Sequence, residues 1–138
     1  MEPHSIRNSP LRKSYLAMQR AALAAVEPGA AVRRHVACSG DQLVVAGRSY
    51  DLREVDKVWV VGGGKASCAM AASLSALLGG RVSGGLVVTK YGHMDPGLDT
   101  GPVEVIEAGH PVPDEAGVSG ARRLVGLVKG ASDHDLVL

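Results

Sequence analysis

The feature that most constrains this chain is a run of three glycines between a short apolar segment and a helical pattern. Residues 58–61 (VWVV) have the uninterrupted apolar composition of a strand buried on both faces. Gly62-Gly63-Gly64 ends that strand, and residues 65–78 then repeat apolar and small side chains at helical spacing. A second apolar strand follows at residues 86–89. This order predicts a βαβ unit with parallel strands and a right-handed crossover.

The remaining chain extends the same architecture. Residues 103–107 read as a third strand, and Asp114 can cap a helix whose apolar positions predict a buried side. Those positions are Val118, Ala121, Leu124, Val125 and Val128. Residues 135–138 begin another apolar strand, which we interpret as an interior strand with neighbours on both sides; the alternative is a short edge strand at a natural terminus. We therefore expect residues 55–138 to form a Rossmann-like α/β domain with a mostly parallel sheet and flanking helices, and we expect it to be truncated.

Residues 1–54 are expected to pack on that domain as an appendage. Apolar residues recur at three- and four-residue steps between Leu11 and Val26, which predicts an amphipathic helix ended by Pro28-Gly29. Residues 42–50 predict one or two short strands or a hairpin.

Charge and composition exclude several functions. Fifteen basic residues stand against 14 acidic ones and only 3% of residues are aromatic, so nucleic-acid binding is not expected. No apolar stretch approaches the ~20 residues of a membrane span. The polar first 12 residues do not resemble a secretory signal, and the two cysteines lack metal or redox spacing. We expect a cytoplasmic protein with no membrane partner and no metal-binding residues.

The glycine run is the first candidate binding site. Gly62, Gly63 and Gly64 carry no side chain, so an anion could approach the backbone N–H groups at the start of the helix. Lys65 adds a positive charge in the first turn, where it opposes the helix dipole. A position unfavourable for the helix and favourable for an anion indicates function. The alternative is that the glycines only allow tight helix–sheet packing and that Lys65 is solvated.

The run matches neither of the common nucleotide-binding motifs. A P-loop has glycine where this chain has Trp59 and a hydroxyl residue where it has Ala66. The dinucleotide fingerprint has a third glycine where this chain has Ser67, and an acidic residue where it has Lys90. The pattern alone therefore predicts an anion but not which one.

Two later segments also follow strand ends, where open α/β sheets bind ligands. Lys90 begins a loop that carries a cation, the phenol of Tyr91 and the imidazole of His93. His110 lies in a loop with two prolines and could contact a phosphate or a hydroxyl group. Asp114 could bind a ligand there, although helix capping is its commoner role.

Three segments in this order resemble one known family, the glycerate 2-kinases, whose C-terminal domain is known as the MOFRL domain. VGGGKA at residues 61–66, with AMA at 69–71, is similar to the signature G-x-G-K-A followed by A-M-A. GLVVTKYGH at residues 85–93 and EAGHPVPDEAG at residues 107–117 resemble the second and third segments. The resemblance runs from about residue 11 to residue 138.

This resemblance implies a Rossmann-like domain that faces a second α/β domain across the active-site cleft. It implies ATP-dependent phosphorylation of D-glycerate to 2-phosphoglycerate, with Mg²⁺. Lys65 matches the signature lysine, whose implied role is to stabilise charge on the transferring phosphoryl group. The family continues beyond Leu138 into a serine- and glycine-rich loop and the second domain. We therefore expect an N-terminal fragment with glycerate and a nucleotide as partners and with no kinase activity of its own.

Two alternatives come from other classes of protein. Some members of the family carry the name hydroxypyruvate reductase, which would imply an NAD(P)H-dependent enzyme, but Ser67 and Lys90 disfavour it. A non-catalytic module that associates through an exposed sheet edge is the other alternative.

Overall fold

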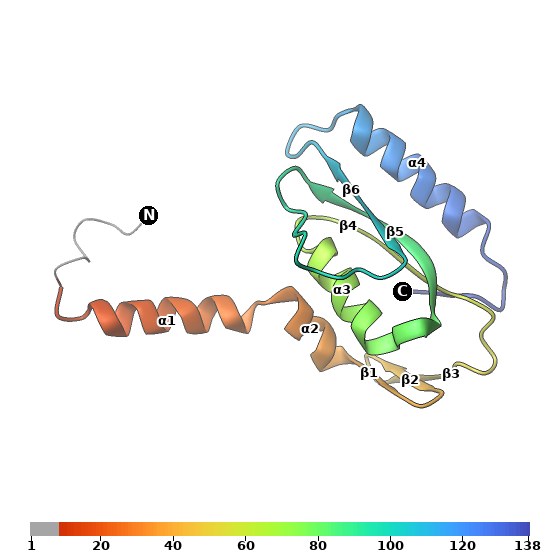
Figure 1. Cartoon of the computed structure of the whole chain (residues 1–138), viewed down its shortest axis with the longest axis horizontal. Helices are drawn as coiled ribbons and strands as arrows, with labels where there is room; N and C mark the ends of the chain where they lie inside the picture. The colour runs from red at the N-terminus through yellow and green to blue at the C-terminus, as the bar shows by residue number, and fades with distance from the viewer. Residues whose placement is uncertain (1–8) are drawn as a thin grey trace.

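Two separate sheets organise residues 9–138, the part of the chain that this computed structural model describes (Figure 1). The elements in chain order are α1 (Arg12–Ala25), α2 (Pro28–His35), β1 (Val36–Ser39), β2 (Gln42–Val45), β3 (Arg48–Asp51), β4 (Val58–Gly63), α3 (Ser67–Leu78), the 3₁₀ turn η1 (Gly79–Arg81), β5 (Val82–Lys90), β6 (Val103–Ala108), α4 (Glu115–Lys129) and β7 (Leu136–Val137).

The main sheet has four parallel strands in the order β6-β5-β4-β7. The expected parallel sheet with flanking helices is therefore confirmed. The chain runs outward from β4 through α3 to β5 and β6, and α4 then returns it to β7 on the other side of β4. In the last pairing, the backbone N–H of Leu138 donates to the carbonyl of Trp59 at 2.8 Å. The strand order thus reverses at β4, and open α/β sheets bind ligands at such a reversal.

The two long helices of this domain cover opposite faces of the sheet. Val87 belongs to the same buried cluster as Ala71 of α3, whereas a Cβ on Gly120 of α4 would lie 2.8 Å from the side chain of Val88. Val87 and Val88 are consecutive in β5, and consecutive residues of a strand point to opposite faces. The glycine-rich turn between β4 and α3 therefore opens at one end of a sheet that is covered on both sides.

Close contact between β4 and β5 depends on one glycine. A Cβ on Gly85 would lie 2.1 Å from the carbonyl oxygen of Val60 on the neighbouring strand, well inside any real contact. The buried residues around this contact are aliphatic, because Val58, Val60 and Val87 are at most 3% exposed. Gly85 therefore sets the spacing of the two strands that lead into the candidate site.

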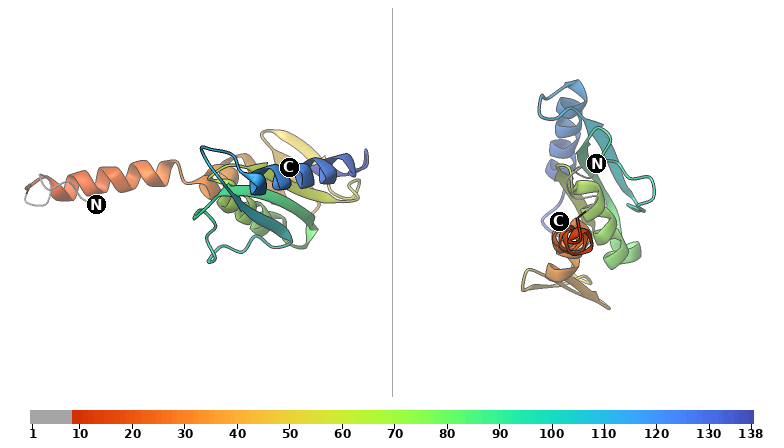
Figure 2. Two further views of the ribbon diagram at one scale, coloured as in Figure 1. Left: turned by 90° about the horizontal axis from the view of Figure 1, so that it is seen from above. Right: turned by 90° about the vertical axis from the view of Figure 1, so that its left-hand side faces the viewer.

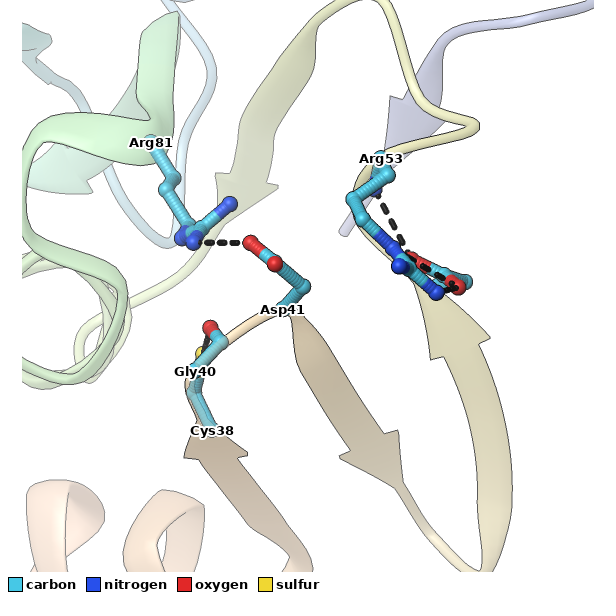
Figure 3. Close-up of polar contacts among 6 residues, drawn as sticks. Cys38, Gly40, Asp41, Arg53 and Arg81 are labelled. Atoms are coloured by element: carbon cyan, nitrogen blue, oxygen red, sulfur yellow. Dashed lines mark hydrogen bonds and ion pairs between the residues drawn. The ribbon is translucent and has the colours of Figure 1, made fainter.

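A small antiparallel sheet, in the order β1-β2-β3, lies at the end of the main sheet where β4 begins (Figure 1). Its residue Leu43 is fully buried and belongs to the same apolar cluster as Val58. Arg81 of η1 forms an ion pair with Asp41 at the β1–β2 turn, as Figure 3 shows. Shared apolar core and this ion pair join the small sheet to the main one.

The N-terminal region differs from its prediction in two respects: α1 does not pack on the main domain, because none of its residues is buried, and a second helix follows it. Pro28-Gly29 follows the first helix as predicted, but Pro28 is also the first residue of a second helix, α2, whose N-cap is Glu27. The carboxylate of Glu27 accepts the backbone N–H groups of Gly29 at 2.7 Å and Ala30 at 2.5 Å. Proline suits a first helical turn because its missing N–H would be unpaired there, and this is why the same dipeptide can end or begin a helix.

Helix α1 projects away from the rest of the molecule in Figure 1 and in the left-hand view of Figure 2. None of its residues is buried, and Met18 is 72% exposed. Within residues 9–138, no helix is long and apolar enough to cross a membrane.

The predicted buried side of α4 is wrong. Only Gly120 of this helix is buried, while Val118, Val125 and Val128 are 39–53% exposed. The helix contacts the sheet mainly over β5 and β6, and it approaches closely at Gly117 and Gly120. Its larger apolar side chains therefore lie beside the contact and not in it.

Candidate functional site

A pocket of about 770 Å³ opens at the carboxyl ends of β4, β5 and β6. It contains most of the side chains that the sequence singled out. The lining residues are Val60, Val61, Gly62, Gly63, Gly64, Lys65, Ala66, Ser67, Met70, Ala71, Leu74, Val87, Val88, Thr89, Lys90, Ala108, Gly109, His110, Gly117 and Leu138. Within the described chain this lining includes Lys65 and Lys90 but no aspartate or glutamate, so the pocket favours an anion.

The turn from β4 into α3 forms the floor of this pocket. Gly64 has a φ of +131°, a conformation that side chains rarely adopt. Its N–H donates to the carbonyl of Val88 at 2.9 Å, so this N–H is not available to a ligand. The next two residues, Lys65 and Ala66, precede the helix, and no described backbone bond uses their N–H groups. The donors available to an anion are therefore at Lys65 and Ala66.

Gly62 and Gly63 have no packing reason to be glycine. A Cβ on Gly62 would make an ordinary contact of 3.7 Å with Val87, and a Cβ on Gly63 would lie 3.8 Å from the carbonyl of Val88. Neither residue has a positive φ. Tight packing of helix on sheet therefore does not explain these two glycines, whereas a ligand that must approach the backbone does.

Ser67 holds the turn in place, a role that sequence reasoning missed. Its hydroxyl lies 2.7 Å from the carbonyl of Gly64 and 3.2 Å from the carbonyl of Val88, and the residue is 7% exposed. The signal was present as a hydroxyl residue at the first position of a helix rich in alanine and leucine. A pattern cannot show, however, that the hydroxyl reaches across to β5.

Three of the predicted site residues, Lys65, Lys90 and His110, come from three elements. Lys65 lies on the glycine turn and is exposed, and Lys90 is the last residue of β5 and is half-buried. His110 is exposed in the loop that follows β6. All three line the same pocket, although they are up to 45 positions apart in the chain. His93 is not among the residues that line it.

Asp114 lies beside the pocket and organises its wall. One carboxylate oxygen accepts the N–H of Gly117 at 3.0 Å, which caps α4 as expected, and the other accepts the hydroxyl of Tyr91 at 2.8 Å. Hydrogen bonds from the N–H groups of Gly109 and Gly117 and from Tyr91 lower the pKa of Asp114 below its ordinary value. The bond to Asp114 in turn raises the pKa of the Tyr91 hydroxyl. Asp114 thus joins the loops after β5 and β6, and both of its oxygens are engaged.

The loop after β5 has a second anchor on β6. The backbone N–H groups of His93 and Met94 both donate to one carboxylate oxygen of Glu107, at 3.2 Å each. This contact ties the exposed segment after Lys90 to β6. Glu107 therefore helps to fix the pocket rim, although it is not itself a lining residue.

Thr89, next to Lys90, was not predicted as a site residue. It is 2% exposed and lines the pocket, and its hydroxyl has no hydrogen-bond partner among residues 9–138. In the sequence it reads only as the last residue of an apolar strand.

No metal site is formed by the described residues. Within residues 9–138, no three His, Cys, Asp or Glu side chains lie close enough to hold a metal ion.

An α/β fold with a glycine turn and a pocket at a strand-order reversal places the chain among the open α/β domains, which bind ligands at the carboxyl ends of their strands. Residues 14–138 match the family described as "Domain of unknown function (DUF4147)", and the chain belongs to that family.

The chain is similar to proteins that carry two different enzyme names. The chain is 35% identical over 127 residues to a glycerate 2-kinase of Pyrococcus horikoshii, an alignment that covers 92% of this chain and 27% of the kinase. It is 46% identical over 79 residues to a putative hydroxypyruvate reductase of Agrobacterium vitis, which covers 57% of this chain and 20% of that protein.

The fold has a solved counterpart. A crystal structure of a protein from Pyrococcus horikoshii superposes with a TM-score of 0.76 at 34% identity, over 94% of this chain and 28% of that one. The chain thus spans about a quarter of the length of the relatives that it matches.

Proposed function

We propose that this chain forms the phosphate-binding side of a glycerate 2-kinase site, at which ATP phosphorylates D-glycerate to 2-phosphoglycerate. The observation that carries the proposal is that Gly62 and Gly63 border a cationic pocket although neither packing nor backbone conformation demands a glycine there. Glycines in that position leave the backbone open to a ligand. The names of the kinase relatives and the charges of Lys65 and Lys90 support phosphate as that ligand.

Each residue has a role that follows from its place. The free N–H groups of Lys65 and Ala66 would bind phosphate oxygens at the N-terminus of α3, where the helix dipole favours negative charge. ATP, when bound, supplies the phosphoryl group. The ammonium of Lys65 would stabilise the charge that develops on the transferring oxygens. Lys90, at the end of β5, and His110, in the loop after β6, would bind and orient the phosphate groups. Asp114 acts indirectly, because it positions the loop that carries His110.

The residues that line this pocket suit the phosphates of an adenine nucleotide better than they suit Mg²⁺. A 770 Å³ cavity with two lysines and a helix N-terminus suits a polyphosphate. Mg²⁺ is usually held by one or two carboxylates together with substrate phosphates. The described residues offer no carboxylate in the pocket lining, and both oxygens of Asp114 are engaged. We assign no step of the reaction to a metal held by these residues.

A hydroxypyruvate reductase is the second candidate, because relatives in Agrobacterium vitis carry that name. Dinucleotide-binding turns place a glycine where Ser67 here fills the space between turn and strand. They also place an acid at the end of the following strand to bind the ribose, and that position is Lys90. Both features favour the kinase.

The test is a titration of the 138-residue chain with ATP and, separately, with NADH, read from the fluorescence of Trp59, the sole tryptophan. We expect ATP to bind and NADH not to bind. Lys65→Met should weaken ATP binding by about tenfold or more, since it removes a charged hydrogen-bond donor. Lys129→Met is the matched control, because Lys129 lies at the far end of α4 and does not line the pocket.

The outcomes separate the candidates. Binding of NADH without ATP would favour the reductase, and binding of neither would refute both. Equal ATP affinities for the Lys65 and Lys129 variants would refute the role of Lys65. We expect no turnover from these 138 residues alone, because phosphoryl transfer depends on groups placed on both sides of the substrate.

Three further expectations stay predictions: a cytoplasmic location, a boundary near residue 54, and association through a sheet edge. The edge at issue is that of β7, where Val137 is 37% exposed. Light scattering of the purified chain would detect such association.

A further inference from the structure

We propose that the hydroxyl of Thr89 is a hydrogen-bonding group for the bound anion, and that it fixes the anion's orientation in the pocket; this inference rests on the phosphate-binding function proposed above. Thr89 is 98% buried and lines the same pocket as Lys65 and Lys90. Its hydroxyl has no hydrogen-bond partner among residues 9–138.

Comparison with the other buried hydroxyl residues makes Thr89 exceptional. Ser67, Ser73 and Ser75 are the other buried hydroxyl residues in the described chain, and each donates to a backbone carbonyl. Their acceptors are the carbonyls of Gly64, Gly29 and Thr100, at 2.7–3.1 Å. Among the buried hydroxyl residues of the described chain, Thr89 is therefore the one whose hydroxyl has no protein partner, whereas Ser67, which also lines the pocket, is satisfied by the carbonyl of Gly64.

An unpartnered buried hydroxyl is costly to the fold. Burial strips water from the hydroxyl, and no protein group replaces it, so the ligand-free protein is less stable than it would be with an apolar side chain there. Valine has nearly the shape of threonine and would avoid this cost, and Val87, two residues earlier on the same face of β5, shows that the environment accepts it. A polar group retained at such a cost indicates a partner that arrives with the ligand.

The position of Thr89 suits this partner. It lies between Val88, whose carbonyl holds the glycine turn, and Lys90, whose ammonium supplies charge. The turn that faces β5 carries no side chains at Gly62 and Gly63 that could cover Thr89. Rotation about the Cα–Cβ bond of Thr89 lets the hydroxyl take the place of the methyl group, so the direction of this donor can adapt to a bound anion. Lysine charges attract an anion without fixing its direction, whereas a hydroxyl bond is directional.

The experiment compares Thr89→Val, which keeps the shape, with Thr89→Ser, which keeps the hydroxyl. The probe is ATP, titrated by calorimetry into the 138-residue chain, and the melting temperature of each ligand-free variant is measured alongside. Thr89→Val should weaken ATP binding about tenfold, as expected for loss of a hydrogen bond to a charged oxygen, while Thr89→Ser should bind within about threefold of the parent. The ligand-free Thr89→Val variant should melt at the same temperature as the parent or higher.

Each result has a distinct meaning. If the parent chain does not bind ATP, the proposed function fails and this inference fails with it. If the parent binds ATP and Thr89→Val binds it equally well, only the role of Thr89 is overturned. A ligand-free Thr89→Val variant that melts clearly below the parent would show that the hydroxyl serves the fold, which also overturns the inference.

Discussion

Replacing Ser67 with alanine removes the hydroxyl that ties the glycine turn to β5. This hydroxyl lies 2.7 Å from the carbonyl of Gly64 and 3.2 Å from that of Val88. Neither carbonyl would lose its last partner: Gly64 would still accept the N–H of residue 67 at 3.1 Å, and Val88 would still accept the N–H of Gly64 at 2.9 Å.

The size of the effect follows from that accounting. A buried acceptor left with no partner would add a desolvation penalty of roughly 1–3 kcal/mol, but no acceptor here is left in that state. The free energy of unfolding should therefore fall only by the net worth of one hydrogen bond, about 1 kcal/mol. ATP affinity should fall as well, because the turn that presents the N–H groups of Lys65 and Ala66 becomes less ordered.

Equilibrium unfolding in urea, followed by the fluorescence of Trp59, measures the first quantity. Ser119→Ala is the matched control, because Ser119 is exposed on α4, and its free energy of unfolding should change by less than about 0.5 kcal/mol. A loss at Ser67 of more than about 3 kcal/mol would mean that the two carbonyls do become unpaired. No loss at all would mean that the hydroxyl does not hold the turn, and either result refutes the reasoning.

Two further predictions concern the strands that carry the site. Gly85→Ala should lower the free energy of unfolding by about 3 kcal/mol or more, because the new Cβ would lie 2.1 Å from the carbonyl oxygen of Val60. Urea unfolding measures this change. Gly80→Ala is the control, since a Cβ there meets nothing within 4 Å and the free energy of unfolding should not change. Asp135 accepts the indole N–H of Trp59 at 3.1 Å, and this bond lowers the pKa of Asp135 below its ordinary value of 3.8. The ionised carboxylate of Asp135 therefore contributes fully to stability above about pH 4, and this contribution is lost as the pH falls through the lowered pKa. The free energy of unfolding of Asp135→Asn should depend less on pH below about 4 than that of the parent. An unchanged acid dependence would contradict the assignment.

Local rules in the sequence predicted the main sheet and the cap of α4. A short run of β-branched apolar residues that ends at a glycine favours a strand. An aspartate before a helical pattern caps the helix through the nearby backbone. Both predictions rest on contacts within a few residues. For the same reason Asp114 could be assigned as a cap from sequence, whereas its bond to Tyr91, 23 positions away, could not.

Burial was harder to predict, because it depends on what lies opposite a helix. The apolar pattern of α4 is real, but its small residue Gly120 makes the contact with the sheet, and its valines lie at the margin. The pattern of α1 is equally regular, yet nothing in the described chain covers it. Periodicity shows which residues share a face and does not show whether that face finds a partner.

The candidate site was predicted in part. The sequence placed charge near the glycine turn because strand ends in such sheets share one edge. It did not identify the hydroxyls of Ser67 and Thr89, because their importance depends on which carbonyls lie within reach of each, and only the packed structure sets those distances.

The pairing of β4 with β7 joins Val58 to Leu136, residues 78 positions apart, whereas β5 meets β4 through a single intervening helix. Closing the longer loop costs more entropy, so during folding β7 should dock after the other strands of its sheet have assembled. Leu138 forms part of the pocket wall. The ligand cavity is thus completed late, and a folding intermediate that already contains β4, β5 and β6 would still lack one side of it.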